Sequence, residues 1–84
     1  MTEKELKDFI CDLILNDGSE IESEQKLFSA GLMDSMNFLE LIQFVEKKCK
    51  IRVTPSQMNL DNWDSVANIM KFVIHEHLAF LIID

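Results

Sequence analysis

The sequence predicts an all-α domain, and three observations support that prediction. Apolar residues make up 48% of the 84 residues, which is enough for a hydrophobic core. Only two glycines and one proline interrupt the chain, whereas a fold of many short strands needs frequent turn residues. Apolar residues also recur at helical spacing in three separate segments. Because the composition is uniform, we expect residues 1–84 to form a single domain.

The first helix is expected to begin beside Thr2. Thr2 and Glu5 have the spacing of a capping box, in which each side chain accepts a hydrogen bond from the other residue's backbone N–H. The sequence Asn16-Asp17-Gly18 is expected to end the helix. Five apolar side chains between these points share one helical face: Leu6, Phe9, Ile10, Leu13 and Ile14.

A long first loop is expected from Gly18 to Asp34, where the sequence has no clean periodicity. A loop of this length is uncommon in a compact domain unless it has a function. We expect an ordered crossover with a short helical turn near residues 24–29. Its apolar residues would anchor it on the core: Ile21, Leu27, Phe28, Leu32 and Met33.

The second helix is expected to begin at Ser35, with Asp34 contributing capping chemistry, and to end near Lys50. Phe44 falls at the edge of its apolar face and is expected to be partly exposed. That face consists of Phe38, Leu41, Ile42, Val45 and Cys49. A mixed stripe lies opposite the face: Met36, Glu40, Gln43 and Lys47.

The remaining chain is expected to hold a linker, a short helical turn and a last helix. Residues 51–53 alternate like a strand but have no partner segment, so we expect an extended linker. Pro55 favours a helical turn through about residue 59, and residues 61–65 favour a second turn with Trp63 packed beneath it.

The last helix is expected to run from Ser65 to at least His77, capped by Asp64 or a neighbour. Its inward side chains would be Val66, Ile69, Met70 and Val73. The apolar tail at residues 78–83 either packs on the core or forms an association surface.

Charge and cysteine usage restrict the function. Residues 1–46 hold eleven acids against three lysines (−8) and residues 47–84 hold four acids against five bases (+1), giving a net charge of −7. Nucleic-acid binding needs a basic surface, so we expect protein partners and no nucleic acid. No apolar run approaches the roughly 20 residues of a membrane helix. Cys11 and Cys49 form no CxxC pair and no signal segment leads the chain, which indicates a cytoplasmic protein.

The sequence gives little support for catalysis or metal binding. A nucleophilic serine needs a base within reach, yet His75 and His77 belong to another helix and point about 200° apart. A calcium loop centred on Gly18 would place two apolar residues among its first three ligands. We therefore expect neither an enzyme nor a metal site.

The junction at residues 31–36 is the strongest candidate site. Ser35 stands at the start of an amphipathic helix, after a long anchored loop. One interpretation is that Ser35 merely caps the helix. The other is that the free amides and positive dipole end of the helix suit a phosphodiester attached to Ser35.

Nearly the whole chain resembles the phosphopantetheine-dependent carrier proteins of fatty-acid, polyketide, nonribosomal-peptide and D-alanyl transfer systems. The resemblance rests on an ordered set of segments: Leu27-Phe28, Ala30-Gly31, Asp34-Ser35-Met36, Glu40-Leu41, Val45-Glu46, residues 51–55 and residues 62–72.

The resemblance implies a four-helix bundle with a long first loop and a short third helix. It implies that Ser35, with Asp34 as its motif neighbour, accepts 4′-phosphopantetheine from coenzyme A through a transferase that usually needs Mg²⁺. The arm's thiol would hold cargo as a thioester for an adenylating or acyl-loading enzyme and for a downstream acyltransferase, synthase or condensing enzyme. We expect a freestanding monomer. Its docking residues would be Met33, Met36, Glu40, Gln43 and Lys47.

Two features favour an aminoacyl cargo. The sequence of residues 31–36, with residues 61–63, is similar to D-alanyl and peptidyl carriers. Fatty-acid carriers have a strongly acidic second helix, whereas here four bases follow Glu46: Lys47, Lys48, Lys50 and Arg52. Two alternatives remain, an acyl carrier for fatty-acid or polyketide synthesis and a helical interaction module without a prosthetic group, which would bind through Met36, Phe44 and the C-terminal tail.

Overall fold

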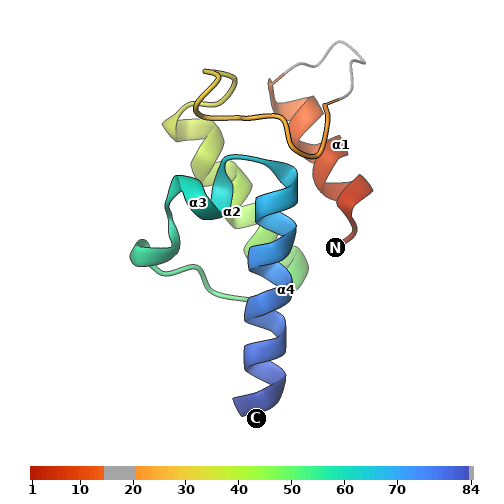
Figure 1. Ribbon diagram of the computed structural model, residues 1–84, viewed down its shortest axis with the longest axis vertical. Helices are drawn as coiled ribbons and strands as arrows, with labels where there is room; N and C mark the ends of the chain where they lie inside the picture. Colours follow the sequence, from red (N-terminus) through yellow and green to blue (C-terminus); the bar gives the residue numbers. More distant parts are fainter. Residues whose placement is uncertain (15–20, 84) are drawn as a thin grey trace.

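A computed structural model describes residues 1–14 and 21–83, with side chains through Glu76 in these ranges. The elements in chain order are α1 (Glu3–Ile14), α2 (Ser35–Cys49), a 3₁₀ helix (Pro55–Gln57), α3 (Leu60–Trp63) and α4 (Val66–Ile83). Helices are the only regular elements of this part of the chain, and they gather around one core (Figure 1). The all-α prediction is therefore confirmed, including the short third helix.

The predicted capping box starts α1. The Thr2 N–H donates to Glu5 Oε1 at 3.0 Å, and the Glu5 N–H donates to Thr2 Oγ1 at 3.1 Å. Leu6 and Ile10 are fully buried, and the other three predicted face residues pack against the core while partly exposed. The predicted stop at residues 16–18 lies outside the described residues.

The described part of the first loop, residues 21–34, is held to the start of α4. Residues 18–20 of the predicted loop lie outside the described residues. The Ala67 N–H donates to the carbonyl of Ser23, and the Leu27 N–H donates to the carbonyl of Asp64, both at 2.8 Å. Leu27 is fully buried, and Ile21 and Met33 in the same loop are buried as well. Phe28 and Leu32 are half-buried. The predicted anchors therefore hold the loop against the core.

The helical turn expected at residues 24–29 is wrong. The amides of residues 27–29, which would close such a turn, donate to the Asp64 carboxylate instead. The chain then reverses in a turn in which the Gly31 N–H donates to the Phe28 carbonyl at 3.0 Å. Gly31 has a φ of 76°, a left-handed conformation that glycine adopts without steric cost. This turn brings the chain back toward the start of α2 (Figure 1).

Helix α2 begins and ends where the sequence predicts. Leu41, Ile42 and Val45 are buried, while Phe38 and Cys49 pack against the core from its edge. Lys50 ends the helix in a left-handed conformation with φ of 54°. At the α1 side, Phe44 stacks flat on Phe9 with ring centroids 4.1 Å apart, which covers part of the edge residue. Phe44 is therefore partly exposed, as expected.

Residues 51–54 have no regular secondary structure, and Thr54 has extended backbone angles (φ −86°, ψ 160°), which agrees with the predicted linker. The Glu46 carboxylate accepts the Val53 N–H at 2.8 Å and fixes the linker beside α2. The 3₁₀ helix is shorter than expected, and residues 60–63 form one turn of α-helix in place of an irregular turn. Trp63 is only 1% exposed, and its Nε1–H donates to the Gln57 carbonyl at 2.8 Å. The indole thus packs beneath the turn, as predicted.

Helix α4 is capped by Ser65, whose Oγ accepts the Asn68 N–H at 3.1 Å. The sequence predicts Asp64 or a neighbour as the cap, and the structure shows that the cap is the neighbour, Ser65. The predicted inward residues are buried or pack against the core: Val66, Ile69, Met70 and Val73. The backbone stays helical to Ile83, and its last turns extend beyond the other helices (Figure 1). The side chains of the apolar tail lie outside the described residues, so neither interpretation of the tail is tested.

Candidate functional site

The start of α2 exposes the hydroxyl-bearing residue Ser35. Asp34 has extended backbone angles (φ −115°, ψ −173°) and caps the helix, because its Oδ1 accepts the Asn37 N–H at 2.9 Å. In return, the Asp34 N–H donates to Asn37 Oδ1 at 3.3 Å. Ser35 is therefore the first helical residue, and the interpretation of Ser35 as the cap is wrong. Its side chain is exposed and adds nothing to the core.

The electrostatic setting of Ser35 fits a phosphodiester. The N–H groups of the first helical residues have no acceptor within their own helix, and the helix dipole places partial positive charge at this end. Asp34 uses its carboxylate on the Asn37 amide, and the first turn of α2 itself contains no acidic residue. An anionic ester on Ser35 would thus face backbone donors, with no helical carboxylate in that turn to repel it.

The buried carboxylate of Asp64 holds the first loop against the segment that precedes α4. Its Oδ1 accepts N–H groups from three consecutive residues: Leu27 at 3.2 Å, Phe28 at 2.8 Å and Ser29 at 3.0 Å. The Ser29 hydroxyl donates to its Oδ2 at 2.5 Å. Asp64 is only 5% exposed, so these donors replace most of its hydration.

Asp64 stays ionised at neutral pH despite its burial. Burial by itself favours the neutral carboxyl, but the hydrogen bonds from Ser29, Phe28 and Leu27 outweigh it and lower the pKa of Asp64 below its ordinary value. A charged acceptor makes stronger hydrogen bonds than a neutral one. The loop is therefore held by one buried negative charge.

Four of the five predicted docking residues lie on the exposed face of α2. Met36 is 72% exposed, and Glu40, Gln43 and Lys47 follow it along the exposed surface. The expectation that Met33 belongs to this surface is wrong, because Met33 is only 6% exposed and forms part of the core. It precedes the cap, so the helical periodicity does not apply to it. An apolar residue before the cap and another at the fourth helical position, here Phe38, are typical of a hydrophobic staple.

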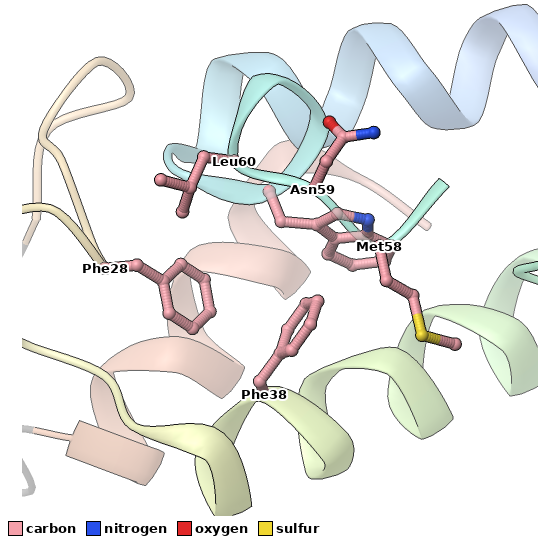
Figure 2. A pocket seen from close by; sticks show the side chains of 6 residues that line it. Phe28, Phe38, Met58, Asn59 and Leu60 are labelled. Carbon is pink, nitrogen blue, oxygen red and sulfur yellow. The ribbon is translucent and has the colours of Figure 1, made fainter. Parts of the chain in front are cut away.

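An apolar pocket of about 230 Å³ opens between the start of α2 and α3, and the sequence does not reveal it. Figure 2 shows side chains from the first loop, from α2 and from the segment before α3 arranged around it. Phe28 and Phe38 meet edge to face with ring centroids 5.0 Å apart. The full lining is Phe28, Phe38, Met58, Asn59, Leu60 and Trp63. Leu39 on α2 and Leu60 on α3 are each more than half exposed, at 56% and 54%.

The remaining reactive side chains do not assemble into a centre in the described part of the chain. No group of three or more potential metal ligands lies together there. Burial raises the pKa of the Cys49 thiol, so this thiol is a weak nucleophile at neutral pH. His75 is exposed on α4, and the His77 side chain lies outside the described residues. None of the helices that the structure describes is long and apolar enough to cross a membrane.

Comparison with known proteins gives consistent matches. Residues 4–73 match the family described as "Phosphopantetheine attachment site". The chain is 36% identical over 69 residues to proteins named D-alanyl carrier protein from Streptococcus gordonii and Streptococcus thermophilus. It has the same identity to the D-alanyl carrier protein of Streptococcus sanguinis. Each alignment covers 82% of this chain and 86% of the relative.

Proposed function

Because the chain belongs to the phosphopantetheine attachment-site family, we propose that the 4′-phosphopantetheine arm is attached to the hydroxyl of Ser35. The protein is a carrier that holds its cargo as a thioester on covalently attached 4′-phosphopantetheine. The observation that carries the assignment to Ser35 is its position. It is the exposed first residue of α2, and its neighbour Asp34 has already capped the helix.

Attachment needs only a reachable hydroxyl from this chain. The Ser35 Oγ forms a bond to the phosphorus of coenzyme A that bears the pantetheine, the pyrophosphate bond breaks, and adenosine bisphosphate leaves. The hydroxyl proton passes to the transferase, which usually requires Mg²⁺. Once attached, the arm supplies a thiol that forms the thioester. Because the backbone N–H groups at the start of α2 face the new ester, its charge is stabilised by the helix.

We propose that residues 1–84 act as a single domain and that they supply no catalytic group. Attachment of the arm then requires a phosphopantetheinyl transferase. Loading of cargo requires an adenylating or acyl-loading enzyme, and its removal requires a downstream acyltransferase, synthase or condensing enzyme. The site of action is the cytoplasm, where coenzyme A is available, and the working form is a monomer.

The cargo is proposed to be an aminoacyl group of the D-alanyl class. The matched relatives carry the name D-alanyl carrier protein, and the similarity covers most of both chains. The second half of α2 supports the same choice, because Lys47 and Lys48 replace the acidic surface that fatty-acid carriers present.

Loading of the modified protein tests this proposal. We expect the protein treated with coenzyme A, Mg²⁺ and a phosphopantetheinyl transferase to gain one D-alanyl group when a D-alanine-adenylating enzyme and ATP are added. Intact-protein mass spectrometry measures the gain, and hydroxylamine should remove it because thioesters are labile to that nucleophile. Loading only with acyl groups would favour the fatty-acid or polyketide alternative. Failure to gain the arm with any transferase would favour the interaction module.

We propose that partner enzymes dock on the exposed stripe of α2 that starts beside the attachment point: Met36, Glu40, Gln43 and Lys47. Met36 stands next to Ser35 and exposes 72% of its surface, so a partner that reaches the arm also covers this side chain. Lys47 lies about 17 Å from Met36 along the helix axis, which makes the stripe long enough for a protein contact.

Replacing Met36 by alanine is expected to weaken docking without weakening the fold. An apolar side chain at the centre of an interface contributes about 1 to 2 kcal/mol, so the KM of the transferase for the carrier should rise roughly tenfold. The stability should change by less than about 0.5 kcal/mol, because the side chain is exposed. Ile74→Ala is the matched control, because Ile74 is an exposed apolar residue on α4 outside this stripe. An unchanged KM for Met36→Ala would remove this residue from the docking surface.

A further inference from the structure

A set of hydrogen bonds runs from the buried carboxylate of Asp64 to Met33, two residues before Ser35. Asp64 accepts three consecutive amides of the loop at Leu27, Phe28 and Ser29. The carbonyl of Leu27 in turn accepts the N–H of Leu32 at 2.8 Å and that of Met33 at 3.1 Å. These bonds fix both ends of the turn that leads into α2.

The same path continues into the cap of α2. Met33 packs its side chain in the core, directly before Asp34. Asp34 then exchanges two hydrogen bonds with Asn37 and sets where the helix begins. The place and direction of the Ser35 hydroxyl therefore depend on the segment that Asp64 holds, although Asp64 lies at the start of the last helix.

We infer that Asp64 is a positioning residue for the modification of Ser35: its carboxylate holds the first loop so that the hydroxyl is presented in one conformation. This inference rests on the proposed function of Ser35. Asp64 touches neither the hydroxyl nor coenzyme A, and it acts only through the loop. The lowered pKa of its carboxyl agrees with this role, because the charge persists at the pH where the transferase works.

Loss of the carboxylate has a specific kinetic consequence. The amides of Phe28 and Ser29 and the Ser29 hydroxyl would lose their acceptor, while the Leu27 N–H would keep only the Asp64 backbone carbonyl. The loop would then sample other conformations before α2. A substrate whose competent conformation is populated only in part binds with an affinity reduced by that fraction. The KM of the transferase for the carrier should therefore rise, while kcat should change much less.

The test compares Asp64→Ala with Val73→Ala, a variant of a buried α4 residue whose side chain makes none of these hydrogen bonds. Initial rates of coenzyme A-dependent modification are measured at a temperature where circular dichroism finds both variants at least ~95% folded. An unfolded fraction that small changes an apparent KM by about 5% only. We expect about a tenfold higher KM for Asp64→Ala, a kcat within about twofold, and values near wild type for Val73→Ala.

Two further measurements separate positioning from general destabilisation. Amide hydrogen exchange at Leu32 and Met33 should become faster in Asp64→Ala and stay unchanged in Val73→Ala. Asp64→Asn keeps an oxygen acceptor for the three amides but loses the charge, so its KM should lie between those of wild type and Asp64→Ala. If Asp64→Ala does not fold, Asp64→Asn and its exchange at the same two amides decide the question.

A wild-type KM for Asp64→Ala, or an equal rise for Val73→Ala, would overturn the inference while leaving Ser35 as the attachment residue. If Asp64→Asn is the only Asp64 variant that folds, a wild-type KM together with unchanged exchange at Leu32 and Met33 would also overturn the inference. If the wild-type protein itself takes no arm, the proposed function fails, and this outcome is distinct because it does not depend on Asp64.

Discussion

Ser35→Ala should gain no phosphopantetheine under conditions that modify the wild-type protein completely. The variant lacks the oxygen that would bond to phosphorus, and the first turn of α2 contains no second hydroxyl to replace it. We therefore expect loss to background, not a slower reaction. Intact-protein mass spectrometry after incubation with coenzyme A and the transferase measures it.

The fold of this variant should persist, which makes the loss interpretable. Alanine is the best helix former, and the Ser35 side chain is exposed, so the stability should change by less than about 0.5 kcal/mol. Ser56→Ala is the matched serine control and should be modified to the wild-type extent, because Ser56 is exposed in the 3₁₀ helix, away from α2. Modification of Ser35→Ala at the wild-type extent would refute the assignment.

Trp63→Ala should have the largest effect on stability. Trp63 is 1% exposed and contacts the rings of Phe38 and Phe72 at centroid distances of 5.6 and 5.5 Å. Removing a buried Trp side chain costs about 3 to 5 kcal/mol, a large fraction of the total stability of a domain this small. We expect a Tm lower by roughly 15 to 30 °C, measured by circular dichroism or calorimetry.

Two variants identify the source of that loss. Trp63→Phe keeps an aromatic ring in the core but loses the Nε1–H that donates to the Gln57 carbonyl. That carbonyl also accepts the Asn62 side-chain amide at 3.0 Å, so we expect a cost of about 1 to 2 kcal/mol. Leu60→Ala, at an exposed neighbour, should cost less than about 1 kcal/mol. A smaller Tm decrease for Trp63→Ala than for Leu60→Ala would contradict this packing.

The features that the sequence predicts well are those encoded by nearby residues. The capping box of Thr2 and Glu5 and the apolar face of α2 depend on spacings of three and four residues, which a sequence displays directly. The start of α2 at Ser35 is local in the same sense, because Asp34 and Asn37 form its cap. Local sequence therefore predicts where α2 begins, whereas the choice of Ser35 as the candidate attachment residue comes from the resemblance to carrier proteins.

The features that the sequence does not reveal depend on contacts between distant segments. Asp64 binds amides 35 to 37 positions earlier in the chain, and no periodicity links such positions. Its own neighbourhood suggests only a helix cap, whereas Ser65 caps α4. The pocket is also assembled from three separated segments, so its lining cannot be identified from any one of them.

The surface position predicted for Met33 is wrong for a different reason. Its closeness to Ser35 in the sequence suggests that it shares the exposed surface of the helix. However, Asp34 is extended and α2 begins only after it, so Met33 is not part of the helix. The core position of Met33 agrees with the staple pattern of an apolar residue before the cap. The sequence therefore does contain a local signal for the burial of Met33, namely its position directly before the helix cap Asp34.

The most direct test of the account is the position of the arm on protein recovered from its native cells. Tandem mass spectrometry of the peptide that contains residues 27–47 should locate one phosphopantetheinyl group on Ser35 and leave Ser29 in the same peptide unmodified. An arm on any other residue, or native protein that consistently lacks it, would contradict the account.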